Sequence, residues 1–393
     1  MKSIFGFTDM KLKEINAHIT AKEIKQQPRL WRETFEVIKN SRERISGFMD
    51  KVLKEKDLRV VLTGAGTSAF VGDSLVPYLN KKIINKVEAI ATTDIVSNPE
   101  NYLYSDIPTL LISYARSGNS PESVATVNLA EDMVDNLYQI FLTCNHEGSL
   151  AKKSFKNDKN LLVLMPEDSN DQGFAMTGSF TCMTLASLLM FDIENMEELE
   201  SSIYSMAKYG ERLLDSRFDD IKEIVSQKFD RAIFLGTSTL KGLSRESALK
   251  TLELTSGRIM TNWDSSLGFR HGPKSIIDDK TLVFSYLSND IYTRKYELDF
   301  LKEMYFENGD AKVVAISDYK DKEVENIVDF LINIKDNKED IEDDVYLLFN
   351  YVLVAQMFAL FKSIDLGISP DNPSPDGIVN RVVKGFTIYP YNK

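Results

Sequence analysis

Short apolar runs rich in β-branched residues alternate with segments of helical character along most of this chain. Between residues 59 and 165 these runs are RVVLTG, KVEAIA, PTLLISYA, QIFLTC and NLLVLM. This alternation is typical of a parallel sheet wrapped by helices, because parallel strands need long crossover connections that are usually helical. The sequence therefore predicts an α/β fold.

The same pattern restarts after a helical stretch, with RAIFLGTS, GRIMTNW, KTLVFSYLS, AKVVAIS and FLINI. The segment VVLTGAGTSAFVGDSL recurs as AIFLGTSTLKGLSRESAL, and both predict a buried strand, a Gly-Thr-Ser turn and a helix. A chain of 393 residues suits two domains of roughly 150 residues with extensions. We predict domains at 45–200 and 201–368, an N-terminal helical extension at 1–44 and a C-terminal tail at 369–393.

The ends of the chain differ from this pattern. Residues 20–56 carry apolar side chains at helical spacing and predict long amphipathic helices. VYLLFNYVLVAQMFALFKSIDLG predicts one long apolar helix, preceded by an acidic loop. The tail that follows is rich in turn residues and without periodicity, so other parts of the protein must hold it in place.

Composition excludes several classes of function. The 47 basic and 59 acidic residues give a net charge of -12, which provides no footprint for nucleic acid. No segment has the roughly 18 unbroken apolar residues of a membrane span, and the N-terminus lacks the features of a secretory signal. We expect a cytoplasmic protein that binds neither nucleic acid nor membrane.

Cysteine and histidine are scarce. Cys144 and Cys182 lie inside apolar stretches, which favours buried thiols over a disulfide framework. The histidines at 18, 146 and 271 have no metal-ligand spacing. We therefore expect no metal and no other cofactor.

The first candidate motif is TGAGTSAF at 63–70, directly after a predicted strand. Gly64 and Gly66 let the backbone approach an anion, while Thr67, Ser68 and the free N–H groups of the next helix supply donors. A dinucleotide fold is an alternative, because Ala69 and Glu88 roughly complete that fingerprint.

The second motif, SYARSGNSPES at 113–123, also ends a strand and opens a helix. Ser117, Gly118, Asn119 and Ser120 cluster donors around one point, and Pro121 suits the first turn of a helix. Two serine-rich turns in one sheet indicate a phosphate held by neutral donors, as in a phosphosugar site.

Three further groups are ambiguous by themselves. Glu246, Lys250 and Glu253 share one helix face and could form an exposed ion-pair ladder. His271, in LGFRHGPKS, could be an ordinary histidine, although Gly272 and Pro273 hold its turn rigidly. Lys384, in NRVVKG, could be a surface lysine on the tail.

Together these motifs resemble the sugar isomerase (SIS) fold in the isomerase half of glucosamine-6-phosphate synthase. The resemblance spans about residues 45–390, and the wording ARSGNSPES, LTCNHEGSLAKKS and LGFRHGPKS is most similar to the AgaS-type galactosamine-6-phosphate deaminase/isomerase family. It implies two tandem SIS domains, each a flavodoxin-like three-layer sandwich. The chain departs from the synthase pattern at Ala115, where the synthase has a further serine.

The resemblance also implies roles for individual residues. The phosphate ligands fall on Ser68, Ser117 and Ser120, with backbone groups near Arg116. Glu253 is the base that moves a proton between C1 and C2, and Lys250 and Glu246 orient it. In the family the residue matching His271 opens the sugar ring in the neighbouring subunit's site, which implies a homodimer, and the residue matching Lys384 lies at the sugar carbonyl.

The expected reaction is conversion of galactosamine 6-phosphate to tagatose 6-phosphate and ammonia. The synthase's amidotransferase half is missing from this sequence, which favours deamination over synthesis. Three alternatives stay open: an aldose/ketose phosphate isomerase without deamination, a glucosamine-6-phosphate deaminase, and a non-catalytic sugar-phosphate sensor.

Overall fold

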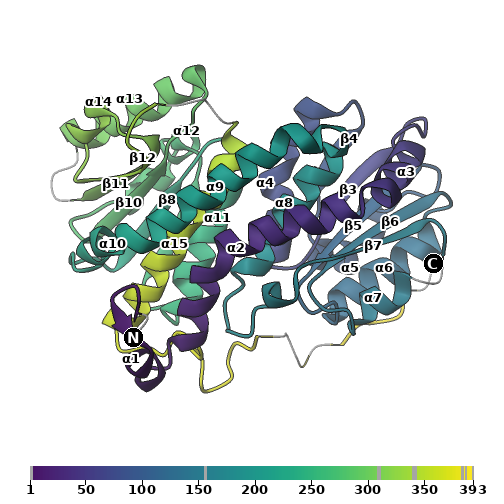
Figure 1. Cartoon of the computed structure of the whole chain (residues 1–393), viewed down its shortest axis with the longest axis horizontal. Coiled ribbons are helices and arrows are strands. Elements are labelled where there is room, and N and C mark those ends of the chain that lie inside the picture. Colours follow the sequence, from purple (N-terminus) through teal and green to yellow (C-terminus); the bar gives the residue numbers. More distant parts are fainter. Residues whose placement is uncertain are drawn as a thin grey trace. The chain divides into compact units, whose positions relative to one another are not determined.

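The computed structural model describes residues 3–154, 157–307, 311–338, 343–381, 385 and 387–391. The chain divides into two compact units, each containing one large sheet (Figure 1). The first-sheet unit comprises Arg29–Gln172, Met176–Tyr204 and Gly377–Lys393, and the second-sheet unit comprises Met1–Pro28, Gly173–Ala175 and Ser205–Asp376. Each unit is thus assembled from three stretches of chain. The domain boundaries inferred from the sequence stay a prediction.

The first-sheet unit is built on a five-stranded parallel sheet with strand order β4-β3-β5-β6-β7. Strands β3, β5 and β6 are buried along their whole length, as expected for a sheet covered on both faces. The strands are β3 (Arg59–Thr63), β4 (Lys86–Ala89), β5 (Thr109–Ala115), β6 (Leu137–Thr143) and β7 (Asn160–Leu164).

Helices cover both faces of this sheet. Val61 and Leu111 pack with apolar residues of α5 and α6, and Phe141 packs with α7. The opposite face meets α8, where the Tyr114 hydroxyl accepts a hydrogen bond from Ser187. The helices are α3 (Arg42–Val52), α4 (Thr67–Lys82), α5 (Thr92–Ser97), α6 (Pro121–Met133), α7 (Ser149–Ser154) and α8 (Gly178–Phe191), with short 3-10 helices at Pro99–Asn101, Glu167–Ser169 and Ile193–Asn195.

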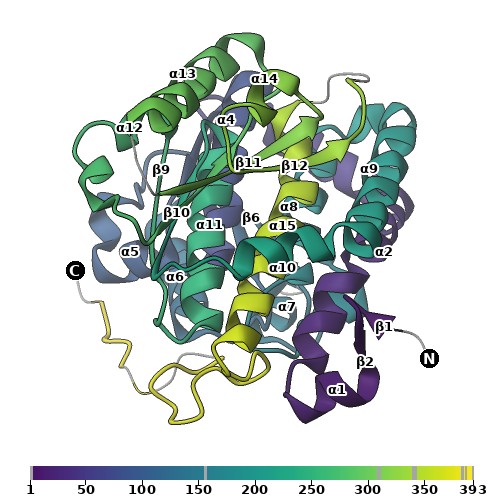
Figure 2. The same ribbon diagram turned by 90° about the vertical axis from the view of Figure 1, so that its left-hand side faces the viewer.

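The second-sheet unit repeats this topology, with strand order β9-β8-β10-β11-β12 and all neighbours parallel. In Figure 2, α12, α13 and α14 lie on one side of the sheet, and α11 and α15 lie on the other. The strands are β8 (Arg231–Leu235), β9 (Met260–Asp264), β10 (Thr281–Tyr286), β11 (Lys312–Tyr319) and β12 (Phe330–Lys335). The helices are α10 (Phe218–Val225), α11 (Thr239–Leu254), α12 (Ser266–Phe269), α13 (Ile291–Glu307), α14 (Lys322–Glu325) and α15 (Asp344–Asp365), with a 3-10 helix at Pro273–Ile276.

Alternating side chains of β8 and β10 explain this arrangement. Ile233 and Val283 pack with residues of α13, whereas Phe234 and Phe284 pack against Phe358 of α15. The result is a helix–sheet–helix sandwich in each unit. The predicted fold class, with two parallel sheets flanked by helices, is therefore confirmed.

The apolar helix α15 is long and apolar enough to cross a membrane by length and composition, with a mean hydropathy of 1.6 over its most apolar window. That window is 94% buried within the protein. Its aromatic side chains pack on the second sheet, so α15 has the character of a core helix.

The N-terminal segment forms a small hairpin that the sequence pattern did not predict. Strands β1 (Ser3–Ile4) and β2 (Phe7–Thr8) pair antiparallel and lead into α1 (Asp9–Glu14). At the turn, Phe5 packs edge-on against Phe361 of α15, and its carbonyl accepts a hydrogen bond from Lys222 at 2.8 Å. The hairpin thereby covers one end of α15.

Two long helices, α2 (His18–Asn40) and α9 (Met196–Ser216), contribute residues to both units. Within the second-sheet unit, Asp371 caps α2 by accepting hydrogen bonds from the amides of Ile19 and Thr20 at 3.0 and 2.8 Å. One part of the tail is thus held by a helix cap.

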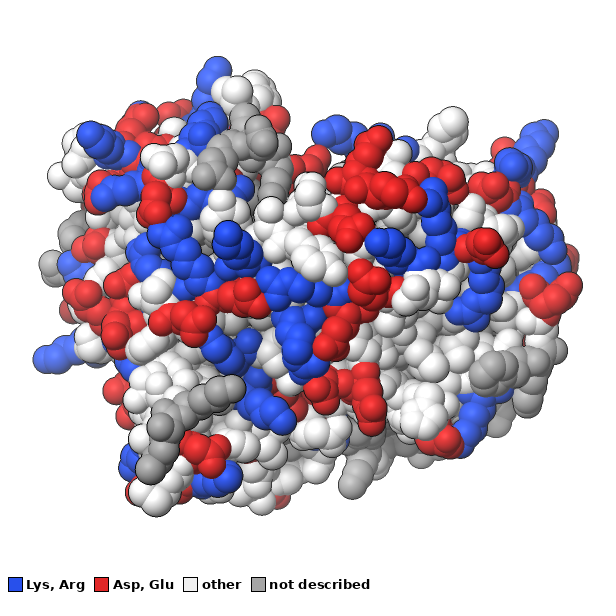
Figure 3. Space-filling view, viewed as in Figure 1, with Lys and Arg blue, Asp and Glu red and all other residues white. Residues whose placement is uncertain are grey.

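The face shown in Figure 3 carries basic and acidic side chains interleaved, without a large patch of one sign. Ion pairs link neighbouring helices, as between Lys39 of α2 and Glu200 of α9 at 2.9 Å, both in the first-sheet unit. Exposed pairs of this kind contribute little to stability, typically below about 1 kcal/mol.

Candidate active site

The chain connects β3 to β4 on one side and β5 to β6 on the other, so the turns after β3 and β5 leave the carboxyl ends of two adjacent strands in opposite directions. In open α/β sheets ligands bind at such a switch point, outside the carboxyl ends of the strands. Both predicted serine-rich turns lie here.

The turn after β3 depends on two glycines, Gly64 for space and Gly66 for a backbone conformation that favours glycine. A Cβ on Gly64 would lie 2.6 Å from the backbone of Ser68, so no larger residue fits. Gly66 has φ of 56° and precedes the first residue of α4. Thr67 and Ser68 then form the first turn of α4 and are buried, so the N-terminus of the helix lies directly after the carboxyl end of β3.

The turn after β5 is held by its neighbours. Gly118 has φ of 66°, and the side-chain amide of Asn145 donates to the carbonyl of Ser117 at 2.9 Å. Ser120 precedes Pro121, the first residue of α6. Ser117 and Ser120 stay partly exposed. The structure therefore places the predicted phosphate-binding residues of both turns at one switch point.

Arg116 and Arg381 tie the C-terminal segment to this region. The buried Arg116 side chain donates to the carbonyl of Arg381 at 3.0 Å, and Arg381 donates to the carbonyl of Asp171. Farther along, a hydrogen bond between Tyr391 and Glu100 raises the pKa of the tyrosine. These contacts hold the described part of the C-terminal segment within the first-sheet unit.

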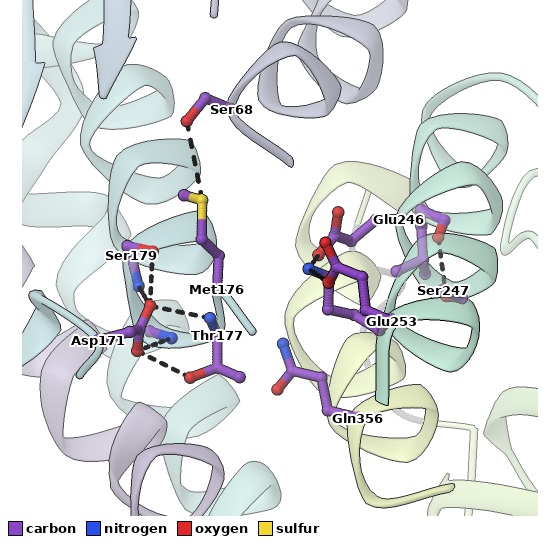
Figure 4. A network of polar contacts seen from close by, with 12 residues as sticks. Ser68, Asp171, Met176, Thr177, Ser179, Glu246, Ser247, Glu253 and Gln356 are labelled. Carbon is purple, nitrogen blue, oxygen red and sulfur yellow. Dashed lines mark hydrogen bonds and ion pairs between the residues drawn. The ribbon is translucent and has the colours of Figure 1, made fainter. Parts of the chain in front are cut away.

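Asp171 is a key residue of this unit that the motifs did not reveal. It is 1% exposed and accepts hydrogen bonds from the amides of Thr177, Gly178 and Ser179 at 2.9 to 3.0 Å, and from the hydroxyls of Thr177 and Ser179 (Figure 4). The carboxylate thereby caps the buried helix α8. Met176, next to this cap, lies 4.0 Å from the Ser68 hydroxyl.

The second-sheet unit holds the predicted carboxylate–lysine group on α11. Glu246 and Lys250 are almost fully buried, while the Glu253 side chain is 23% exposed. Lys250 Nζ lies 2.5 Å from Glu253 Oε2 and 3.6 Å from Glu246 Oε1. Figure 4 shows Glu246 and Glu253 on the same side of this helix. The interpretation of these three residues as an exposed ion-pair ladder is therefore wrong, because the lysine between the carboxylates is buried.

His271 lies in a turn between α12 and the 3-10 helix at Pro273–Ile276, and its side chain is exposed. Gly272 has φ of 120°, a backbone conformation that favours glycine. On either side, Arg270 and Lys274 both form ion pairs with Glu303 of α13. These pairs hold the turn while leaving the imidazole accessible.

The remaining sequence predictions concern Lys384, the two cysteines and metal binding. Lys384 lies outside the described residues. Cys144 and Cys182 are buried free thiols, as predicted, and burial raises the pKa of Cys144 to about 12. Within the described ranges, no three His, Cys, Asp or Glu side chains come together as metal ligands would.

A doubly wound sheet with phosphate-type serine turns at its switch point defines the class of SIS-domain proteins, and the SIS domain model matches residues 52–191. The chain belongs to the AgaS family. It is 42% identical over 386 residues to the D-galactosamine-6-phosphate deaminase AgaS of Shewanella sp. strain ANA-3, covering 98% of this chain and 95% of that protein.

Solved structures agree with this membership. A Clostridium novyi NT protein, described as a candidate tagatose-6-phosphate ketose/aldose isomerase, is 53% identical with a TM-score of 0.98 and covers 100% of both chains. The tagatose-6-phosphate ketose/aldose isomerase of Escherichia coli is 38% identical with a TM-score of 0.87, covering 95% of this chain and 97% of that one. The family predicted from the motifs is therefore confirmed.

Proposed function

We propose that this chain converts D-galactosamine 6-phosphate to D-tagatose 6-phosphate and ammonia. The observation that carries the proposal is the similarity, over 98% of the chain, to a protein named D-galactosamine-6-phosphate deaminase. The serine turns of the first-sheet unit and the buried group on α11 supply the two kinds of chemistry that such a reaction needs: anion binding and proton transfer.

The phosphate binds at the first switch point. Backbone amides near Gly66, Arg116 and Gly118 and the hydroxyls of Thr67, Ser68, Ser117 and Ser120 donate hydrogen bonds to its oxygens. Two helices, α4 and α6, begin at these turns, and the positive ends of their dipoles favour a bound anion. No basic side chain is needed for this mode of binding.

Proton transfer belongs to Glu253. His271 first opens the pyranose ring by moving a proton between the ring oxygen and the C1 hydroxyl. Glu253 then takes the proton from C2 of the open-chain 2-amino aldose while O1 takes up a proton, which gives a 1,2-enolamine. Glu253 returns its proton to C1 and the nitrogen gives up one proton, which leaves a 2-imine beside a C1 hydroxyl. Water adds to C2 and expels ammonia to leave the ketose. Lys250 and Glu246 orient Glu253, and the family pattern assigns Lys384 to the carbonyl end of the substrate.

This scheme includes a homodimer in which His271 serves the site of the neighbouring subunit, and a cytoplasmic location. The exposure of His271 on a turn held by ion pairs supports the first part. Besides water, the sugar phosphate is the only small molecule that the scheme requires.

Ser117→Ala should raise KM with little change in kcat. One hydrogen bond to a charged phosphate contributes about 1.5–3 kcal/mol, which corresponds to an increase of roughly 10- to 100-fold. Steady-state kinetics with galactosamine 6-phosphate measure this effect, and Ser105→Ala, at an exposed serine of the same unit, is the control. An unchanged KM in Ser117→Ala would remove this serine from the phosphate site.

Ammonia release measured side by side with galactosamine 6-phosphate and glucosamine 6-phosphate tests the function. We expect ammonia and a ketose 6-phosphate from the galacto substrate. A preference for the gluco substrate would make the chain a glucosamine-6-phosphate deaminase.

Two solved structures of high similarity favour a second candidate, because one is described as a tagatose-6-phosphate ketose/aldose isomerase and the other as a candidate for that activity. Release of no ammonia, together with interconversion of tagatose 6-phosphate and its aldose, would establish that candidate. Binding of sugar phosphate without any turnover would indicate a sensor.

A further inference from the structure

The two sheets carry equivalent switch points. Gly236 of the second sheet is as crowded as Gly64, with a potential Cβ contact of 2.4 Å to the backbone of Leu240. Ser238 has φ of 57° and ψ of -124° before α11, nearly the same as Gly66 before α4, at 56° and -129°. The turn after β8 therefore has the backbone shape of the phosphate turn after β3.

The second pair of turns matches in the same way. β5 pairs with β3 through Thr109 and Arg59, and β10 pairs with β8 through Thr281 and Arg231, in the same register. The turn after β10, with Ser288 and Asn289, thus stands where the turn after β5 carries Arg116 and Ser117. The two sheets therefore place turns of matching backbone geometry at equivalent positions.

In the second sheet a carboxylate from the chain itself occupies this position. Glu297 of α13 is fully buried, and its Oε2 accepts a hydrogen bond from the amide of Ser288 at 2.8 Å. The Thr237 hydroxyl of the other turn is near enough to lower the pKa of this carboxyl group, while Oε1 has no hydrogen-bond partner of ordinary geometry within the described part of the chain. Glu297 therefore faces both turns, as a bound oxyanion would.

A second carboxylate completes the arrangement. Asp344, at the start of α15, accepts hydrogen bonds from the Ser288 hydroxyl at 2.5 Å and from the Asn289 amide at 2.8 Å. The amides of Ser288 and Asn289 and the Ser288 hydroxyl thus donate to carboxylates of α13 and α15. The Asn289 side-chain amide donates to Asp318 of β11, so these four donors are already used by described residues of the chain.

The first sheet lacks such a carboxylate. Glu297 is the seventh residue of α13, and the seventh residue of α6 is Val127. Among the described residues, no carboxylate forms a hydrogen bond with the side chains of Thr67, Ser68 or Ser117. Among the described residues, carboxylates therefore bind the turn after β10 of the second sheet, whereas none binds these side chains of the first sheet.

We propose that the turns after β8 and β10 form a second oxyanion-binding site, and that the carboxylates of Glu297 and Asp344 occupy it as built-in ligands. The chain therefore takes a single sugar phosphate, at the first sheet. In the second sheet the same frame fixes the start of α11, the helix that carries Glu253, to α13 and α15.

The stability of the wild-type protein should depend on pH through Glu297, and the stability of Glu297→Gln should not. The pKa of Glu297 is raised from the usual 4.5 to about 7, with burial as the largest cause and Asp344 acting in the same direction, while Ser288, Thr237 and Arg294 act to lower it. Because the pKa of this carboxyl group is higher in the folded than in the unfolded state, its contribution to the free energy of unfolding is fully present below about pH 4.5. That contribution is lost as the pH rises through about 7. Thermal midpoints between pH 5 and pH 8 should fall more steeply in wild type than in Glu297→Gln.

Chemical rescue tests the proposal itself. Glu297→Ala vacates the position of the carboxylate, whereas Glu297→Gln fills it. We expect acetate, compared with chloride at equal ionic strength and pH, to raise the thermal midpoint of Glu297→Ala by about 3 °C or more. Wild type and Glu297→Gln should show no such gain.

Where Glu297→Ala does not stay folded in chloride, the yield of folded protein after dilution from denaturant into acetate or chloride gives the same comparison. An acetate-specific gain confined to Glu297→Ala supports the built-in ligand. Equal midpoints, or equal yields, in the two salts for Glu297→Ala would overturn it. Galactosamine-6-phosphate turnover is not part of this readout, so a failure here is distinct from a failure of the proposed function.

Discussion

Glu253→Gln is expected to lower kcat for galactosamine 6-phosphate by about a hundredfold or more, the effect typical of losing a general base. The amide keeps the size of the side chain and can still accept a hydrogen bond from Lys250, which lies 2.5 Å from the Glu253 carboxylate. It cannot take the C2 proton. The loss corresponds to about 2.7 kcal/mol of transition-state stabilisation, with KM nearly unchanged.

Single-turnover and steady-state rates on the same preparation separate this effect from slow product release. Glu198→Gln, at an exposed carboxylate of α9, is the matched control and should keep normal turnover. If Glu253→Gln turns over at close to the wild-type rate, another group is the base.

Asp171→Ala is expected to give a large loss of stability. The carboxylate accepts three amide and two hydroxyl hydrogen bonds at the start of a helix that is buried from Gly178 to Met190. Each buried donor left without a partner costs about 1–3 kcal/mol, so a total of at least about 3 kcal/mol is expected. For a chain of this size, the thermal midpoint should fall by on the order of 10 °C.

Asp371 provides the comparison for this variant. It also caps a helix, accepting two amide hydrogen bonds and one from the Thr20 hydroxyl of α2, but it is only partly buried, so water can replace it. Asp371→Ala should cost about 1 kcal/mol, the usual value for a cap. Differential scanning calorimetry of both variants measures the difference, and equal losses would contradict the importance given to burial of Asp171.

The strands of both sheets could be predicted from the sequence because parallel strands buried on both faces appear as uninterrupted apolar runs. RVVLTG and KTLVFSYLS contain β3 and β10 with errors of a few residues at the ends. The recurrence of a strand, a glycine turn and a helix also gave the tandem arrangement, because the crowded glycine that ends each strand, Gly64 or Gly236, leaves no room for a Cβ. The two Gly-Thr-Ser triplets themselves are shifted by two residues in the structure, since Ser238 and not Gly236 takes the backbone conformation of Gly66.

Asp171 and Glu297 could not be predicted in this way. Asp171 lies seven residues before the first residue of the helix that it caps, within a loop that has no periodicity. Glu297 belongs to a helix whose charged residues look like a solvated face, and only the folded chain buries it. The N-terminal hairpin was missed because its strands have two residues each, too short for a period-two pattern.

The candidate site was predicted in part from residue chemistry and in part from resemblance. Glycine and serine at strand ends indicate an anion site on physical grounds, and the structure places both turns at one switch point. Spacing along a helix put Glu246, Lys250 and Glu253 on one face, but only the structure shows that the lysine is buried. The roles of Glu253, His271 and Lys384 come from the family pattern and stay predictions.

The division of each unit into separate stretches of chain affects how the protein is made. Residues of the first-sheet unit are synthesised both before and after Ser205–Asp376, which belong to the other unit. Domains usually fold one after another as they leave the ribosome. Here all five strands of the first sheet are translated before the second sheet, whereas Arg381, which donates to Asp171, is translated only after it. The first sheet is therefore available early, but the first-sheet unit is completed only when the last part of the chain has emerged.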